Sequence, residues 1–202
     1  MWTNFFDKIY CINLPKRTDR LIKFVEEMDK YGIDFDLVNG IENENGAEGL
    51  RQTVENILND ALDKNYEQIL IFEDDCYFLC DPNPIMELAI KELPEYWHIL
   101  YLGGQCVNGF NRRHSQTLLQ LDTCYATHSW AISRQGIKEI LAVGLNAPID
   151  NSLVDNIQKQ EKCFITYPLL TCQRAGMSNI GNTEIDWSTF IIDRYNQKLA
   201  LL

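Results

Sequence analysis

The chain has 202 residues, with 29 acidic and 18 basic side chains and a formal net charge of -11 at neutral pH. This charge argues against nucleic acid or an anionic membrane as a partner, because their phosphates would be repelled at long range. The length favours one domain over residues 1–202, and no apolar run is long enough to span a bilayer. Peripheral association with a membrane stays open.

The first residues and the cysteines favour a cytoplasmic location. Residues 1–7 lack the basic and apolar regions of a secretion signal. The seven cysteines are scattered, with no CxxC pair and no zinc-like spacing, and an odd number without a signal indicates reduced thiols.

The predicted elements alternate between strands and helices. Strands are expected at 9–14, 34–38, 68–72, 98–102, 125–133 and 163–167, and helices at 19–30, 50–64, 85–93, 134–143, after 148 and at 186–202. Thr18 is expected to cap the first helix. Residues 105–122, which include Arg112, Arg113 and His114, are expected to form a long loop or a hairpin. The alternation predicts an α/β layered fold with a mainly parallel central sheet and helices on both faces.

The strand predicted at 68–72 runs directly into Glu73, Asp74 and Asp75. Its apolar run indicates a strand that is buried on both faces. Three adjacent carboxylates repel one another unless a cation lies among them, and oxygen ligands suit Mg²⁺ or Mn²⁺. Because open α/β sheets bind ligands at the carboxyl ends of their strands, the stretch predicts a metal site there. A strand followed by a solvated acidic turn is the alternative.

The order of several short motifs resembles that of glycosyltransferase family 25, which includes lipooligosaccharide galactosyltransferases and the collagen galactosyltransferase domain. The resemblance covers roughly residues 8–180. The matching stretches are residues 12–14 with Arg17, Asp19 and Arg20; the helix at 49–62; residues 69–75, 99–103 and 127–134 with Gly136; residues 148–150; and Pro168 and Leu169 with Gln173 and Ser178.

The resemblance implies a GT-A fold and a donor that is a UDP-hexose, such as UDP-galactose or UDP-glucose, bound with Mn²⁺ or Mg²⁺. It also implies an acceptor hydroxyl on a glycan, a lipid-linked glycan or a protein. The metal ligands carried over from the family are Asp75 and Glu73. The donor-binding residues carried over are Asn13, Arg17, Arg20, Glu73, Asp74 and His128. For Arg17 and Arg20 the alternative is a solvated first helical turn, and for His128 it is a buried core position.

The family is grouped as inverting, so a general base must take the proton of the acceptor hydroxyl as it attacks the anomeric carbon. Asp150, at a family-matched position after Pro148, is the candidate for this base. Its alternative role is a helix N-cap. Gln173 and Ser178 are the candidate acceptor-binding residues.

The sequence departs from the family pattern at three places. Thr53-Val54 stands where the family has Ser-His, His98 where it has Asp, and Asn179 where it has Asp. These departures motivate a second hypothesis, a nucleotide-sugar or carbohydrate-binding protein of the same fold with weakened catalysis. A metal-dependent phosphohydrolase is a third hypothesis, but the Asp-x-Asp-Thr pattern of the haloacid type is absent after Phe72.

The resemblance also suggests a role for residues 105–122. In GT-A enzymes, loops near the metal commonly close over the donor and exclude water. We therefore expect this segment to order on donor binding, with Arg112, Arg113 and His114 turned towards a diphosphate or an anionic acceptor.

Overall fold

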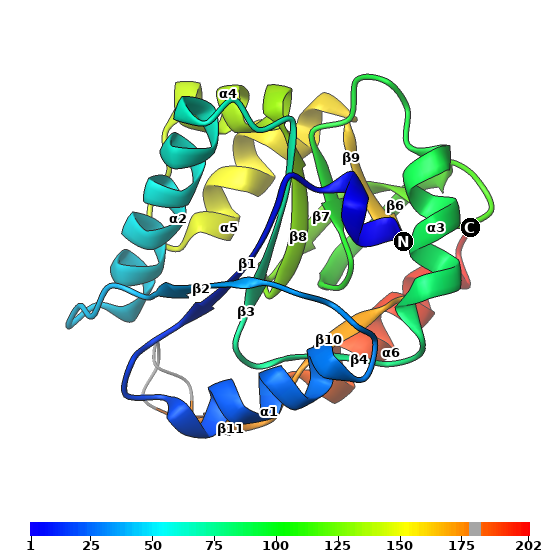
Figure 1. The fold of residues 1–202 in the computed structure, drawn as a ribbon. Helices are drawn as coiled ribbons and strands as arrows, with labels where there is room; N and C mark the ends of the chain where they lie inside the picture. Colours follow the sequence, from blue (N-terminus) through cyan, green and yellow to red (C-terminus); the bar gives the residue numbers. More distant parts are fainter. Residues whose placement is uncertain (178–182) are drawn as a thin grey trace.

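The structure, a computed structural model, describes residues 1–177 and 183–202, and Figure 1 shows a large sheet between helices. The helices are α1 (Thr18–Asp29), α2 (Gly46–Asp63), α3 (Pro82–Glu92), α4 (Arg134–Val143), α5 (Ile149–Ser152) and α6 (Ser188–Leu199), with helical turns η1 (Trp2–Phe5), η2 (Leu153–Ile157) and η3 (Gln158–Gln160). The strands are β1 (Lys8–Asn13), β2 (Asp36–Asn39), β3 (Gln68–Glu73), β4 (Cys76–Phe78), β5 (Ile99–Tyr101), β6 (Gln105–Arg113), β7 (Leu118–Tyr125), β8 (Ser129–Ser133), β9 (Cys163–Thr166), β10 (Thr171–Gln173), β11 (Gly176–Met177) and β12 (Glu184–Ile185).

The central sheet has the strand order β2-β1-β3-β8-β5-β9-β7-β6. β1 is parallel to β2 and β3, and β5 is parallel to β9, whereas β8 is antiparallel to both of its neighbours and β7 to both of its own. Six of these eight strands therefore point the same way, and only β7 and β8 are reversed. The predicted α/β fold with a mainly parallel sheet is confirmed.

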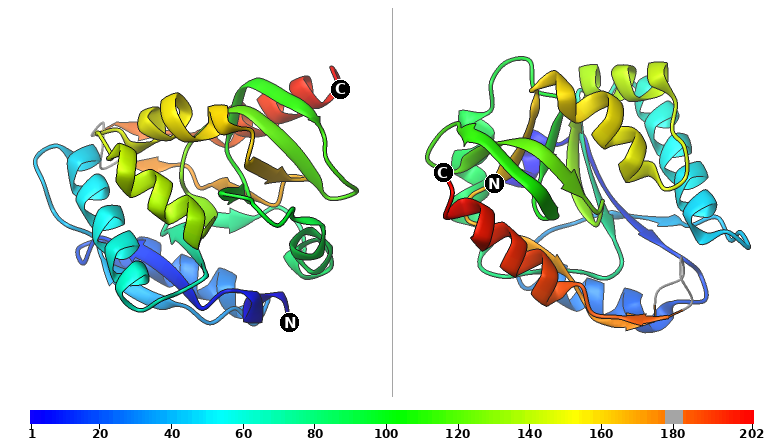
Figure 2. Two further views of the ribbon diagram at one scale, coloured as in Figure 1. Left: turned by 90° about the horizontal axis from the view of Figure 1, so that it is seen from above. Right: turned by 180° about the vertical axis from the view of Figure 1, so that it is seen from behind.

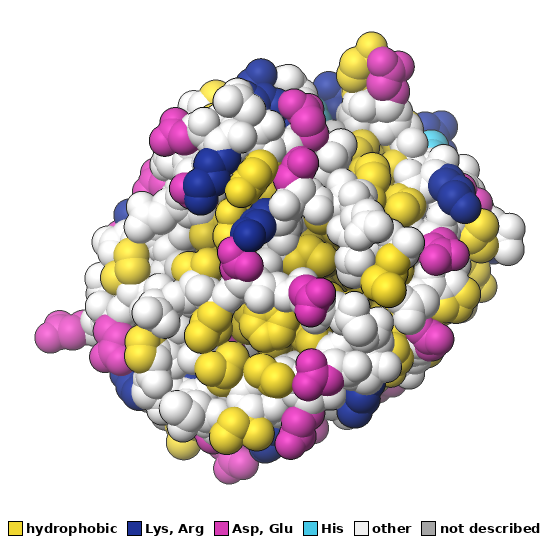
Figure 3. Space-filling model, in the orientation of Figure 1, with side chains coloured by type: hydrophobic (Ala, Val, Ile, Leu, Met, Phe, Trp, Pro, Cys, Tyr) yellow, Lys and Arg dark blue, Asp and Glu magenta, His cyan; other side chains and the backbone are white. Residues whose placement is uncertain are grey.

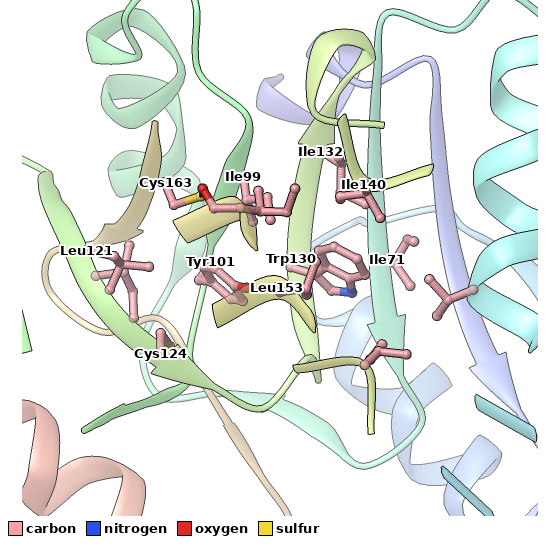
Figure 4. Packing of buried hydrophobic residues seen from close by; sticks show 14 of the residues in the cluster. Ile71, Ile99, Tyr101, Leu121, Cys124, Trp130, Ile132, Ile140, Leu153 and Cys163 are labelled. Atoms are coloured by element: carbon pink, nitrogen blue, oxygen red, sulfur yellow. Dashed lines mark hydrogen bonds between the residues drawn. The ribbon is translucent and has the colours of Figure 1, made fainter. Parts of the chain in front are cut away.

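Alternate residues of the strands fill two separate cores. In β3, Ile69 and Ile71 belong to the core under α2 and α4, whereas Leu70 and Phe72 belong to the core under α1 and α3. Figure 2 shows these two pairs of helices on opposite sides of the sheet. Figure 4 shows Trp130 of β8 packed beside Ile71 in the first core. Burial on both faces explains why residues 69–72 of β3 are apolar at consecutive positions.

Several helix starts differ from the prediction, among them those of α1, α2 and α3, which begins at Pro82 instead of residue 85. α2 begins at Gly46 instead of residue 50, because the side chain of Asn45 accepts a hydrogen bond from the backbone N–H of Ala47 and caps the helix. Thr18 is the first residue of α1 and not its cap, since Arg17 holds that position without a capping side-chain hydrogen bond. At the other end of the chain, α6 lies within the helix predicted at 186–202.

The strand predicted at 125–133 begins later, because only residues 129–133 form β8 and its first predicted residue, Tyr125, ends β7. β7 ends at Tyr125 and β8 begins at Ser129, and Ala126 between them has a φ of 71°, a left-handed conformation that a strand cannot contain. β7 pairs with β6 in an irregular antiparallel hairpin, so the segment predicted as a loop or hairpin is a hairpin that forms the edge of the sheet.

A short pair of strands was not predicted and sets the geometry beside the acidic turn. β4 pairs with β10, and Gln173 lies opposite Cys76. Cys76 is the residue that follows Asp75 in the chain. The backbone N–H of Arg174 then donates to the carbonyl of Asp75 at 2.7 Å. Residues about 100 positions apart in the chain are thereby fixed side by side, and Gln173 is brought to the acids.

The surface carries mixed charge. On the face shown in Figure 3, acidic and basic side chains are interspersed with apolar ones. Within residues 1–177 and 183–202, no helix combines the length and the apolar character needed to cross a membrane.

Candidate active site

The three carboxylates follow β3 at the edge of the sheet. Glu73 is the last residue of β3, and Asp74 and Asp75 form the turn to β4. Nη1 of Arg20, in the first turn of α1, donates to Oδ1 of Asp74 and to Oδ2 of Asp75, both at 3.0 Å. The other oxygen of Asp75, Oδ1, is buried and has no hydrogen-bond partner among the described residues. One guanidinium therefore serves two carboxylates and leaves one carboxylate oxygen unpaired.

Burial raises the pKa values of all three acids, and for Glu73 and Asp74 the charges of neighbouring carboxylates add to this effect. Burial raises the pKa of Glu73, and the charges of Asp75, Asp74 and Asp150 raise it further, although Thr127 opposes this with a hydrogen bond of 2.9 Å. Burial and the charge of Asp75 raise the pKa of Asp74 to about 6, against the opposing charge of Arg20. A cation at the turn would relieve both the desolvation and the mutual repulsion.

The donor set fits a hard divalent ion held by few protein ligands. Among the described residues, no three His, Cys, Asp or Glu side chains converge on one point. The buried, unpaired Oδ1 of Asp75 is available to an ion, and Glu73, the other predicted ligand, uses only its Oε1 to accept from Thr127. Mg²⁺ and Mn²⁺ commonly take one or two carboxylates and complete their shell with water and phosphate oxygens.

A cavity of about 170 Å³ lies against the turn, and we call it the Arg20 cavity. Its wall includes the three acids, the residues that flank the end of β1, and the start of α2. Two cations line it, Arg20 and Arg174. The Arg174 guanidinium donates to the carbonyl of Cys76 at 2.6 Å and to Glu27 at 3.1 Å, so its position is fixed by the protein.

Thr53, where the family pattern has Ser, also lines the Arg20 cavity. Its hydroxyl donates to the carbonyl of Gly49 and accepts from the backbone N–H of Ile41 at 2.9 Å. A Cβ on Gly49 would lie 2.2 Å from the Ile41 carbonyl oxygen, so only glycine allows this close approach. The loop after β2 is thereby held on the first turns of α2, and it forms one wall of the cavity.

A second cavity, of about 390 Å³, contains Asp150, and we call it the Asp150 cavity. Pro148 is the N-cap of α5 and Asp150 lies inside the helix, so its carboxylate does not cap the helix. Oδ2 of Asp150 instead accepts a hydrogen bond of 3.3 Å from the backbone N–H of Ala126. The left-handed Ala126 thus helps to orient the predicted base.

The two cavities adjoin. Five residues line both of them: Leu50, Glu73, Gln173, Ile185 and Trp187. Glu73 therefore stands between Arg20 on one side and Asp150 on the other. The structure brings six predicted site residues to this double cavity: Arg20, Glu73, Asp74, Asp75, Asp150 and Gln173.

Four predicted residues lie elsewhere or outside the described chain. Asn13 is 2% exposed; its amide donates to the Leu14 carbonyl, and its Oδ1 has no partner among the described residues. Arg17 donates to Asp19 and to the carbonyl of Met177 and is not in either cavity wall. Ser178 lies outside the described residues.

His128 occupies a core position. Its side chain is fully buried, and its Nε2 lies 3.3 Å from the hydroxyl of Thr171. Burial lowers the pKa of His128 to about 4, so the imidazole is neutral at pH 7. His128 does not line either cavity, and its burial favours a role in packing over one in ligand binding.

The basic residues of the hairpin lie at its turn, away from both cavities. Arg113 donates to the carbonyls of Ser115 and Gln116, and its guanidinium lies 4.5 Å from the ring centroid of Tyr167. Neither cavity wall, as far as it is described, includes Arg112, Arg113 or His114. The hairpin has its own strand pairing and internal bonds, so the structure does not support the expected lid over the diphosphate.

Arg174 and Trp187 are among the wall residues that sequence reasoning missed. Arg174 directly follows Gln173, a predicted site residue, and this position in the sequence could have indicated that Arg174 lies near the site. Trp187 lines both cavities and is 39% exposed, but its sequence neighbours show no motif, because the folding of the chain before α6 brings it there.

Comparison with known proteins identifies the class of fold. No family model matches the chain. The structure of A197 from STIV is similar with a TM-score of 0.54 and 12% identity, over 88% of this chain and 91% of that one. A mutant of the Drosophila β-1,4-galactosyltransferase 7, in complex with manganese, UDP-Gal and xylobiose, gives a TM-score of 0.53 and 14% identity over 95% and 73% of the two chains.

A third similar structure is a glycosyltransferase involved in the glycosylation of the major capsid of PBCV-1. Its TM-score is 0.51 and its identity 15%, over 78% of this chain and 80% of that one. At these identities the similarity concerns the fold. The fold of this chain is that of the GT-A glycosyltransferases.

Proposed function

We propose that this protein is a metal-dependent glycosyltransferase that moves a hexose, galactose or glucose, from a UDP-sugar to a hydroxyl of a glycan, lipooligosaccharide or protein acceptor with inversion. It would act in the manner of family 25. The observation that carries the proposal is the pair of adjoining cavities: one has two arginines and an unpaired carboxylate oxygen, the other has an oriented carboxylate, and Glu73 stands between them.

The Arg20 cavity suits the donor. A nucleoside diphosphate is anionic, and guanidinium groups pair with phosphate oxygens through well-directed hydrogen bonds. Arg20 and Arg174 are both held in the wall by protein contacts, which lowers the entropy cost of binding. A divalent cation at Asp75 Oδ1 would neutralise the diphosphate as it leaves.

The Asp150 cavity suits the acceptor and the base. The acceptor hydroxyl oxygen attacks the anomeric carbon, the bond from that carbon to the diphosphate oxygen breaks, and UDP leaves with the bonding electrons. The hydroxyl proton passes to the carboxylate of Asp150, which the Ala126 N–H orients. Glu73 lies in the wall that both cavities share, where the hexose would be transferred from the donor to the acceptor.

The test combines binding with turnover. A thermal-shift screen of UDP-, GDP- and CMP-sugars, with and without Mn²⁺, measures donor choice, because a ligand of the native state raises the melting temperature. Assays of donor hydrolysis and of transfer follow with the sugar that stabilises most. The proposal predicts Mn²⁺-dependent stabilisation by a UDP-hexose and measurable transfer. Stabilisation without hydrolysis or transfer would instead favour the nucleotide-sugar-binding protein, and no stabilisation by any sugar nucleotide would contradict both.

A further inference from the structure

The two cavities differ in the charges of their walls. Arg20 and Arg174 line only the Arg20 cavity. The described wall of the Asp150 cavity contains no Lys, Arg or His, but it does contain two carboxylates, Asp150 and Glu73. Residues 178–182, which follow Met177 in the chain, are Ser, Asn, Ile, Gly and Asn and add no charged side chain. As far as it is described, this wall therefore offers an acidic ligand no cationic partner.

The uncharged groups of this wall are those that bind sugar hydroxyls. Gln105 and Gln173 carry amides that both donate and accept hydrogen bonds, and Thr127 carries a hydroxyl. Tyr125 and Trp187 add aromatic rings, and Trp187 is 39% exposed. Ligand sites commonly combine such apolar surfaces with a few polar groups that fix orientation.

We infer that the Asp150 cavity takes the uncharged end of a glycan and rejects a terminal sugar that carries a carboxylate or phosphate. This inference rests on the proposed function and narrows its acceptor to neutral sugars. An anionic sugar in this cavity would lie near the carboxylate of Asp150 without a counter-charge from the described wall, and both desolvation and repulsion would oppose its binding.

A cationic acceptor is disfavoured by the chemistry of the base. An amine beside Asp150 would pair with its carboxylate and stabilise the ionised form. Such a carboxylate is a weaker acceptor for the hydroxyl proton, so pairing would slow the step that Asp150 is proposed to carry. A neutral hydroxyl leaves the base free.

The experiment compares acceptors that differ only in charge. Wild-type protein, loaded with Mn²⁺ and the donor from the screen, is assayed with p-nitrophenyl β-glucoside, the matching glucuronide and the matching glucosaminide, and with the equivalent galactose series. We expect kcat/KM for each uronide to be at least about tenfold below that of its neutral partner, which corresponds to about 1.4 kcal/mol. Saturation-transfer NMR with UDP and Mn²⁺ present measures the same preference in binding, independently of turnover.

A charge added to the wall sharpens the test. Gln105→Lys introduces a cation into the Asp150 cavity, and we expect it to raise the ratio of uronide to neutral kcat/KM at least about threefold. The matched control is Gln135→Lys, which adds the same charge on the exposed face of α4 and is expected to leave the ratio unchanged. Thermal melting of both variants confirms that they are folded.

Three results would overturn the inference. Equal or better use of the uronides, faster use of the amino sugars than of the neutral ones, or no sugar binding in either assay would each contradict a neutral glycan site. These failures are distinct from failure of the proposed function, which would show as loss of Mn²⁺-dependent UDP-sugar binding in the Arg20 cavity. A protein that binds UDP with Mn²⁺ but prefers uronides keeps the proposed function and loses this inference.

Discussion

The Arg20 cavity and the Asp150 cavity share five residues and yet are built by different parts of the fold. The first lies at the ends of the parallel strands β1 and β3 and takes its cations from α1 and from the residue after β10. The second lies between the hairpin β6–β7, the irregular link to β8 and the start of α5. A regular sheet edge therefore provides the cavity that contains arginines, and the less regular second half provides the cavity whose described wall has no cation.

Under the proposed function, this difference would allow one fold to bind two unlike substrates side by side. Arginines and carboxylates gather in one cavity, where an anionic donor and a cation would be needed. Amides, aromatic rings and one oriented carboxylate line the other, where a hydroxyl must lose a proton. The predictions below perturb one cavity and measure the effect on both.

The largest effect is expected from the Asp150 cavity. Asp150→Asn should lower the rate of transfer by about 10²–10⁴, the usual contribution of a general base, and leave UDP–Mn²⁺ affinity unchanged. Steady-state kinetics and calorimetric titration measure the two quantities. Asp155→Asn, on an exposed carboxylate of η2 next to α5, is the control and should match wild type in both. An Asp150→Asn enzyme with normal turnover and a lowered melting temperature would mean that the carboxylate is structural.

The complementary change is in the Arg20 cavity. Asp75→Asn should weaken Mn²⁺-dependent UDP binding by at least about 10–100-fold, because even indirect partners of a metal typically contribute that much. The fold should be retained, since the change keeps the shape of the side chain at a turn. Calorimetric titration of UDP with and without Mn²⁺ measures this, with the exposed Asp63→Asn of α2 as the control. Equal affinities for Asp75→Asn and wild type would remove the acidic turn from the metal site.

Arg20 is expected to stabilise the fold by pairing with the carboxylates of Asp74 and Asp75. Arg20→Gln leaves Asp74 and Asp75 buried without their shared partner, which should lower the free energy of unfolding by about 3 kcal/mol in metal-free protein. Mn²⁺ should then stabilise the variant more than wild type, because the ion replaces part of the lost charge. Lys64→Gln, which removes an exposed pair with Asp60 at the end of α2, is the control and should change little. Denaturant unfolding with and without Mn²⁺ decides between these outcomes.

The smallest expected effect concerns Glu27, which holds Arg174 in the Arg20 cavity. Burial works to raise the pKa of Glu27, but hydrogen bonds from Lys30 and the Phe78 N–H, and the charge of Arg174, outweigh it and lower the pKa below its usual value of 4.5. Its stabilising contribution is therefore fully present above pH 4.5 and is lost as the pH falls through the lowered pKa. Glu27→Gln should cost about 1–2 kcal/mol at pH 7, and the gap to wild type should narrow below pH 4.5. A gap that stays constant down to pH 3 would contradict this assignment.

Much of the donor side could be predicted from the sequence because its signals are local. An apolar run followed by three acids defines a strand and its carboxyl edge, and the same edge holds the turn into α1 that contains Arg20. The helix at 134–143 was also predicted with its observed bounds. These features depend on periodicity and on single turns of chain, which a sequence shows directly.

Other features of the site and its surroundings depend on contacts that a sequence does not show. The pairing of β4 with β10 joins segments about 100 residues apart, and each strand is too short to give a period-2 pattern. The break between β7 and β8 depends on a positive φ at Ala126. Because alanine rarely adopts such a φ, the residue type did not predict a break at this position. His128 shares its motif with residues of the site, but tertiary packing places it in the core.

The central claim is that an anionic donor and its cation occupy the Arg20 cavity while the Asp150 cavity stays free for the acceptor. Crystals grown with UDP and Mn²⁺ test it most directly, because anomalous scattering locates the manganese without reference to a model of the ligand. We predict one anomalous peak within bonding distance of Asp75 Oδ1, with the diphosphate between this peak and Arg20. A manganese peak bound to Asp150, or UDP in the Asp150 cavity, would contradict the claim.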